Sequence, residues 1–177
     1  MFEIERMKQA ISSRNGLART NLFQVNLPLI VGGVRLSEEP FGETRKSVLD
    51  LMCTATQLPG RQILMNDRVI GIKKEQMAYG YEAPDVNLSF YDNNRYSIRK
   101  YFESWQNRII NPETRELRFK NQYSADVYIT QFDHQERPVY GVNLLEAFPS
   151  TLNVVDLNND PNGLVQVNVQ LTYTNWR

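Results

Sequence analysis

The chain has 177 residues, of which 41% are hydrophobic, and its 20 basic side chains balance 20 acidic ones. This length allows one domain with a core that needs no metal or disulfide, and the single cysteine, Cys53, excludes an internal disulfide. A net charge of zero excludes a general attraction to nucleic acid or anionic membranes. Because no apolar run approaches the roughly 20 residues of a membrane helix and no signal segment is visible, we expect a cytoplasmic site of assembly and no membrane contact.

The first 16 residues predict a short amphipathic helix or arm. Ile4, Met7 and Ile11 lie three and four residues apart, which is helical spacing, and an Asn-Gly pair follows as a stop. We therefore expect a helix that precedes the main domain.

The next part of the chain predicts two strands separated by a long loop. Residues 21–27 alternate apolar and polar side chains, and residues 48–56 are bounded by a Leu-Pro-Gly turn. Residues 32–47 contain three glycines, a proline and many charges without periodicity. We interpret them as an inserted surface loop.

Residues 61–79 predict a hairpin extension with its turn at Asn66 and Asp67. Both faces of this segment are interpreted as polar, so the core of the domain would not fix the strand register. A neighbouring molecule could fix it instead.

A strand at residues 86–91 leads into the most clearly marked helix. Asp92, Asn93 and Asn94 are good capping residues. Five apolar side chains then recur at helical spacing and predict a stripe that packs across a sheet. They are Ile98, Tyr101, Phe102, Trp105 and Ile109.

The last part of the chain predicts further strands. One begins near Ala125 and ends at a turn over residues 134–138, and another covers residues 142–148 until Pro149 breaks it. Residues 164–176 alternate apolar and polar side chains as one long strand with two faces. Its polar face carries Gln166, Asn168, Gln170 and Thr172.

These elements predict one mainly β (α+β) domain over residues 1–177, with antiparallel strands, one packed helix, a hairpin extension and a short N-terminal helix. The sheet could be a closed barrel or a sandwich with the helix laid against it. The sequence leaves these two architectures open.

The search for chemistry gives no catalytic, cofactor-binding or metal-ligating residues. His134, the single histidine, has no second imidazole or thiol at ligand spacing, and an Asn-rich turn at residues 156–163 departs from the calcium-loop pattern. No glycine-rich phosphate loop is present. We therefore expect a protein that is not an enzyme and needs no cofactor.

Several stretches together resemble the tail tube proteins of contractile-tailed bacteriophages, in the same order along nearly the whole chain except residues 32–47. They are Ala18-Arg-Thr-Asn-Leu-Phe-Gln-Val-Asn-Leu27, Cys53-Thr-Ala-Thr-Gln-Leu-Pro-Gly60, Val86-Asn-Leu-Ser-Phe-Tyr-Asp92, Phe102-Glu-Ser-Trp-Gln106, Ala147-Phe-Pro-Ser150 and residues 171–176. The family also includes relatives in type VI secretion and other contractile injection machines.

The resemblance implies a virion tail protein, assembled in the host cytoplasm, whose subunits form hexameric rings that stack into a hollow tube inside a contractile sheath. Its partners would be further copies of itself, the sheath protein, the tape-measure protein, the baseplate initiator and the tail terminator. DNA would pass transiently and without sequence preference.

The resemblance also assigns roles to two groups of residues. The hairpin would stack one ring on the next through Arg61, Gln62, Met65, Arg68, Lys73, Lys74 and Glu75. The polar face of the last strand would line the lumen or contact a neighbouring subunit.

Three alternatives remain open. The chain could be a tube-initiating or baseplate protein of the same fold, or the tube protein of a bacterial contractile injection system. A carbohydrate-binding module that uses its tyrosines is a more distant possibility.

Overall fold

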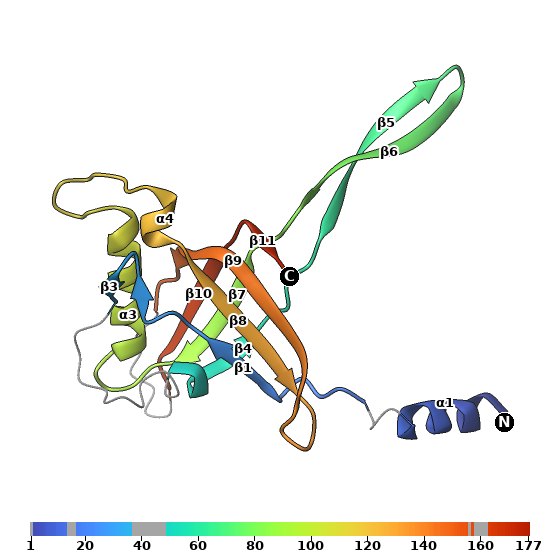
Figure 1. The fold of residues 1–177 in the computed structure, drawn as a ribbon, viewed down its shortest axis with the longest axis horizontal. Helices are drawn as coiled ribbons and strands as arrows, with labels where there is room; N and C mark the ends of the chain where they lie inside the picture. Colours follow the sequence, from blue (N-terminus) through green and yellow to red (C-terminus); the bar gives the residue numbers. More distant parts are fainter. Residues whose placement is uncertain (1, 14–16, 37–48, 156, 158–162) are drawn as a thin grey trace.

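The computed structural model describes residues 2–13, 17–36, 49–155, 157 and 163–177. Its centre is an antiparallel seven-stranded sheet in the order β1-β8-β9-β10-β7-β4, with β11 paired to β9 (Figure 1). The strands are β1 (Phe23–Asn26), β4 (Cys53–Thr56), β7 (Val86–Tyr91), β8 (Ala125–Phe132), β9 (Pro138–Leu152), β10 (Gln166–Thr172) and β11 (Asn175–Trp176). The mainly β class with antiparallel strands is confirmed.

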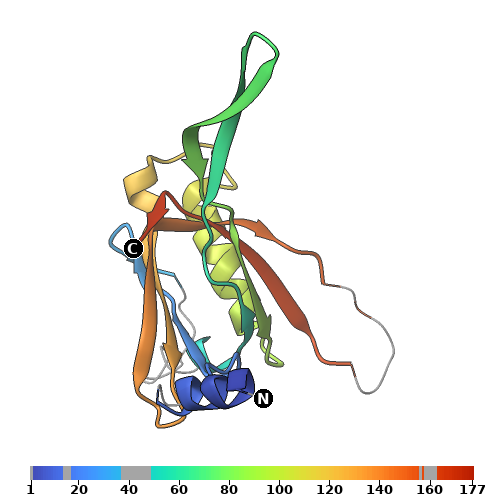
Figure 2. The same cartoon turned by 90° about the vertical axis from the view of Figure 1, so that its right-hand side faces the viewer.

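The long strand β9 joins the two halves of this sheet. Its first part pairs with β8, and its last part pairs with β10. Glu146, between these parts, has a φ of 53°, a left-handed conformation that is uncommon outside glycine. Figure 2 shows the two halves splayed on either side of one core.

The sheet is open, so the closed-barrel alternative is wrong. Among the described residues no backbone ladder joins the end strands β1 and β4. A side-chain hydrogen bond links β1 to the helical turn that precedes β4, with Gln24 Nε2 donating to Asp50 Oδ2 over 3.3 Å. Since both strands are only four residues long, they offer little backbone for closing the sheet.

The helix α3 (Ser97–Ile109) covers the core as predicted (Figure 1). Its start is held by Asp92, whose carboxylate accepts the backbone N–H groups of Ile98 and Arg99 at 3.1 Å each. Four members of the predicted stripe are buried, and Ile109 is only half-buried. Phe102 stacks on Trp105 and lies beside Phe90 of β7, so aromatic contacts join the helix to the sheet.

Of the two shorter helices, the sequence predicted one and missed the other. The N-terminal helix α1 (Phe2–Ser12) is confirmed and lies away from the sheet (Figure 1), with Ile4 and Met7 each 62% exposed. The helix α4 (Lys120–Tyr123) was not predicted. It is joined to α3 by Trp105, whose indole Nε1–H donates to the Tyr123 carbonyl over 2.7 Å.

The predicted loop at residues 32–47 begins with a small hairpin, β2 (Ile30–Val31) and β3 (Val34–Arg35). Its turn uses Gly32 and Gly33, with φ of 56° and 78°. A Cβ atom on Gly32 would lie 2.1 Å from the carbonyl oxygen of Gln122, so only glycine fits there. The remainder of the predicted loop, residues 37–47, lies outside the described residues.

Three predicted strands have different bounds in the structure. Residues 49–51 are helical, and β4 begins only at Cys53. Pro149 does not end β9, because it lies opposite Leu171 at a shift in register, where a ladder hydrogen bond is dispensable. The long final strand is interrupted at Tyr173 and Thr174, and β11 then continues antiparallel to β9 in the same register as the end of β10.

Candidate assembly surfaces

The hairpin of β5 (Gln62–Ile70) and β6 (Lys73–Glu82) projects from the body as a separate two-stranded sheet (Figures 1 and 2). Nine residues at about 3.3 Å each give it a reach of roughly 30 Å. The predicted turn is wrong, because Asn66 and Asp67 pair with β6 and the chain reverses at Gly71, whose φ is 64°. This position favours glycine.

The prediction that the hairpin is polar on both sides is also wrong. Eight large apolar or aromatic side chains on it are at least 47% exposed. They are Ile63, Met65, Val69, Ile70, Ile72, Met77, Tyr79 and Tyr81. These side chains are interspersed along the hairpin with charged and polar residues. Exposed apolar side chains in such numbers are typical of a surface that another protein covers.

The structure places six of the seven predicted stacking residues on the hairpin ladder. Gln62 and Met65 lie toward its base, and the four charged residues lie toward its tip. Lys74 Nζ lies 2.6 Å from the Asp67 carboxylate, and Arg68 is opposite Glu75 in the register. Both pairs are exposed and contribute little to stability by themselves. The charged groups remain at the surface, where a partner could reach them.

Arg61, the seventh predicted residue, lies at the base of the hairpin. Its guanidinium carbon lies 4.9 Å from the ring centroid of Tyr81 and 5.3 Å from that of Trp176. Trp176 Nε1 also donates to the carbonyl of Gly60 over 3.1 Å. These contacts form a clamp between the hairpin and the C-terminal strand β11. The role of Trp176 was not predicted, because it follows Gly60 by more than a hundred residues.

The polar face of β10 is partly used inside the sheet. Asn168 Oδ1 accepts the hydroxyl hydrogen of Ser89 at 2.7 Å, and Gln170 Nε2 donates to Asp85 over 2.9 Å. Gln166 is exposed, and Thr172 is half-buried. The structure therefore brings these four residues onto one side of β10, between β7 and β9, and leaves Gln166 the most accessible.

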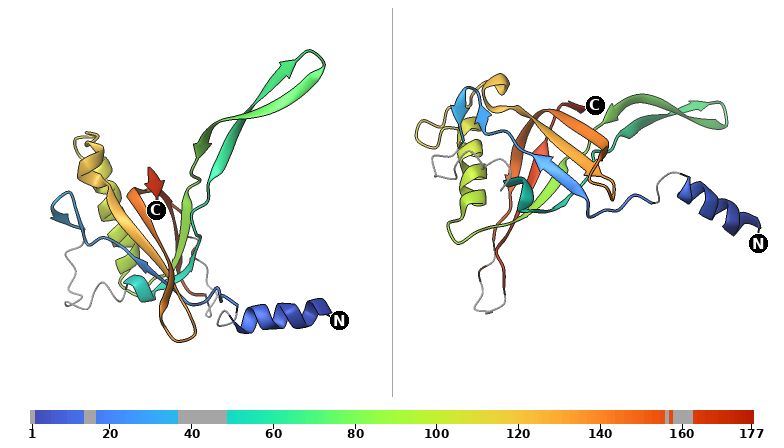
Figure 3. Two further views of the ribbon diagram at one scale, coloured as in Figure 1. Left: turned by 45° about the vertical axis from the view of Figure 1, so that its right-hand side comes forward. Right: turned by 60° about the horizontal axis from the view of Figure 1, so that its bottom comes forward.

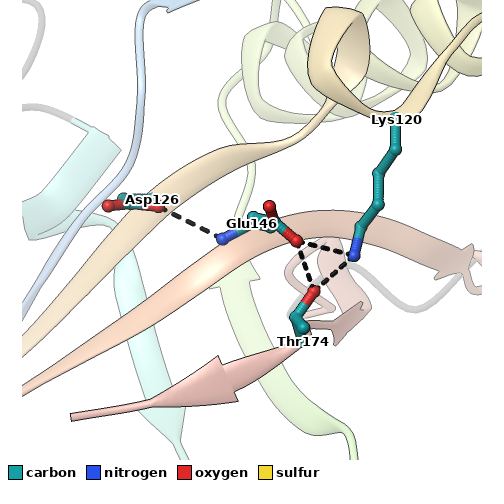
Figure 4. Close-up of polar contacts among 4 residues, drawn as sticks. All are labelled: Lys120, Asp126, Glu146 and Thr174. Carbon is teal, nitrogen blue, oxygen red and sulfur yellow. Dashed lines mark hydrogen bonds and ion pairs between the residues drawn. The ribbon is translucent and has the colours of Figure 1, made fainter.

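A polar network holds the bend of β9 (Figure 4). The Glu146 carboxylate accepts from Lys120 Nζ at 2.8 Å and from the Thr174 hydroxyl at 2.6 Å, and its backbone N–H donates to Asp126 over 3.1 Å. These contacts, first the hydrogen bond from Lys120, lower the pKa of Glu146. The network ties α4 and the turn before β11 to the sheet, and the sequence analysis did not identify it.

The described residues contain no group of His, Cys, Asp and Glu suited to a metal ion. His134 lies exposed in the β8–β9 turn, next to Asp133. Cys53 is partly buried, and burial raises the pKa of its thiol to about 12, so the thiol stays protonated at neutral pH. No described helix has the length and apolar character needed to span a membrane.

Comparison with solved structures shows the same fold in contractile injection machines. A chain of the six-fold symmetrised anti-feeding prophage baseplate gives a TM-score of 0.65 at 17% identity, covering 91% of this chain and 94% of that chain. A chain of the anti-feeding prophage tube-terminating cap gives 0.61 at 15% identity, with 91% and 89% covered. A chain of the sheath-tube complex of the extracellular contractile injection system PVC, in the extended state, gives 0.60 at 12% identity, with 91% and 90% covered.

Comparison with curated protein sequences gives no match. The family model described as phage tail tube protein matches residues 18–177. This range includes every strand of the sheet, the helix α3 and the projecting hairpin. The chain therefore belongs to the phage tail tube protein family.

Proposed function

We propose that this protein is the repeating structural subunit of a tail tube, with no enzymatic activity of its own. Six copies form a ring, and rings stack into a hollow tube inside a contractile sheath, between a baseplate initiator and a tail terminator. The observation that carries this proposal is the β5–β6 hairpin, which extends roughly 30 Å and exposes apolar side chains along its length.

The open sheet supports self-assembly for a second reason. β1 and β4 each pair with only one neighbouring strand among the described residues. Unpaired strand edges are templates for pairing with another chain. Contact with further copies of the subunit would cover these edges.

In this tube, the bore conducts DNA and the tape-measure protein. Uncharged side chains on β10, such as Gln166 and Thr172, suit a lumen that carries a polyanion. Each phosphate neutralised by a lysine or arginine would add affinity and hold the DNA in place. The same face could instead contact a neighbouring subunit of the ring.

The hairpin can be removed to test this function. A variant in which an Asn-Gly turn replaces residues 67–76 should form rings or monomers but no tubes, while the unmodified protein forms tubes in negative-stain electron microscopy. Circular dichroism and a thermal melt would check that the body of the variant still folds. Normal tubes from the variant would refute the stacking role.

The main alternative is a tube-initiating or baseplate protein of the same fold, because the similar structures include baseplate and cap proteins. An initiator should form a single ring and stop, whereas a tube subunit polymerises with itself. Self-assembly of the purified protein therefore separates the two.

A further inference from the structure

A groove of about 760 Å³ lies where the sheet fails to close. One wall is the start of β1 with the residues before it, and the other wall is the short helical turn at 49–51 with the start of β4. Phe132, at the end of β8, and Glu136, in the β8–β9 turn, also line the groove. Both walls are edges of the seven-stranded sheet.

The described lining of the groove combines apolar side chains with one exposed carboxylate. Leu22, Phe23, Leu51 and Phe132 line it, and Leu51 is 81% exposed. The described lining also includes two acidic residues, of which Asp50 is buried and accepts a hydrogen bond from Gln24, whereas Glu136 is exposed. An extended segment with apolar side chains and a positive charge would complement this surface.

The tip of the β5–β6 hairpin has this complementary chemistry. Val69 and Ile70 are more than half exposed, and the side chain of Ile72 is fully exposed. Between residues 67 and 75, three basic side chains exceed two acidic ones. Within the described part of the chain, no further strand pairs with the outer edges of β5 and β6, so these edges could bond to another backbone.

The tip and the groove lie at opposite ends of the molecule. In Figures 1 and 2 and in the left view of Figure 3, the hairpin projects from one end, while the β8–β9 turn, which contributes Glu136 to the groove, lies toward the other. One molecule's tip therefore cannot fill its own groove. It can reach only the groove of another copy.

We propose that the β1–β4 groove is the receptor for the hairpin tip of a second copy, with Ile72 and its neighbours lying between the two sheet edges. This contact joins two unlike surfaces at opposite ends of each molecule, and such a contact repeats without closing. The inference rests on the proposed function, because it names the surface that receives the stacking hairpin.

Disulfide trapping tests this contact directly. In a Cys53→Ala background, the double variant Ile72→Cys and Leu51→Cys should give, in assembled and oxidised tubes, a ladder of dimers, trimers and larger species on non-reducing gels. Each single-cysteine variant can give dimers at most. A matched double variant, Ile72→Cys with Leu117→Cys, should give no ladder, since Leu117 is 71% exposed on the α3–α4 connection away from the groove.

The outcomes separate this inference from the proposed function. Tubes of the Ile72 and Leu51 variant without a ladder, or a ladder from the Leu117 control, would overturn the receptor groove and leave the tube subunit standing. Absence of tubes from the unmodified protein would overturn the proposed function and this inference with it.

A second measurement covers the case in which the cysteine variants fail to assemble. Leu51→Arg should raise the protein concentration needed for tube formation about tenfold or more, equivalent to about 1.4 kcal/mol or more, because it places a charge in an apolar contact. Leu117→Arg should assemble like the unmodified protein. Normal assembly of Leu51→Arg, or an equal defect in both variants, would overturn the proposal.

Discussion

Trp176 connects the hairpin to the folded body through Arg61 and Gly60. Trp176→Ala removes a cation–π contact and a hydrogen bond, and should lower the free energy of unfolding by about 1 to 2 kcal/mol. It should also raise the protein concentration required for tube assembly, because the hairpin is no longer held in one orientation relative to the body. Urea denaturation and electron microscopy check both effects. Trp176→Phe keeps a ring and should lose less, whereas equal stability of Trp176→Ala and the unmodified protein would contradict the clamp.

The apolar stripe of α3 has a gradient in burial that stability measurements can detect. Trp105 is fully buried and donates to Tyr123, so Trp105→Ala should cost about 3 to 5 kcal/mol. Ile109 is only half-buried, and Ile109→Ala should cost clearly less. Chemical denaturation of both variants gives the comparison. Equal losses would show that the stripe is not oriented as described.

Glu146 makes the stability of the bend depend on pH. Hydrogen bonds from Lys120 and Thr174 hold the pKa of Glu146 below its ordinary value of 4.5. Glu146 therefore contributes fully to the free energy of unfolding above pH 4.5. This contribution is lost as the pH falls through the lowered pKa. Melting temperatures measured from neutral to acidic pH should fall less steeply in Glu146→Gln than in the unmodified protein. Thr174→Ala, which leaves the lysine in place, should give an intermediate slope. Identical slopes in all three proteins would contradict this role.

The polar face of β10 yields a prediction about the bore. Lysines at Gln166 and Thr172 should slow the passage of DNA if this face lines the lumen, since each added cation can bind a phosphate. Plating efficiency of a phage that carries the double substitution measures delivery, and tubes seen by microscopy provide the control for assembly. Unchanged delivery through normal tubes would assign the face to a subunit interface.

The sequence predicted the elements whose pattern is local. The three-four spacing of apolar residues in α3 and the alternation in β7 identified the buried face of each element, because each pattern follows from the geometry of a single helix or strand. Asn66 and Asp67 resembled a turn by composition, yet Gly71 provides the left-handed residue that the reversal uses. Local composition thus located the hairpin but misplaced its turn.

The features that depend on distant residues could not be predicted in this way. Pro149 remains within β9 because its partner is Leu171 at a register shift, a pairing that no local pattern reveals. The receptor groove combines residues near positions 22, 51 and 134, and only the folded sheet brings them together. Exposed apolar residues on the hairpin were present in the sequence, but their burial could not be judged without the fold.

Taken as a whole, the molecule is a curved sheet from which a hairpin projects at one end (Figure 1). It has one buried core, and the groove lies toward the other end. Because the net charge is zero, copies of the chain do not repel one another strongly. In the proposed tube, apolar surface at both ends would favour association between unlike ends, and such association would produce a linear stack. The shape and charge agree with a subunit whose working form is a polymer.

The state of the purified protein at rising concentration tests this central claim most directly. Negative-stain electron microscopy, together with sedimentation velocity, should show rings and then hollow tubes whose length increases with concentration. A protein that stays a single folded monomer at the highest concentration reached would contradict the account.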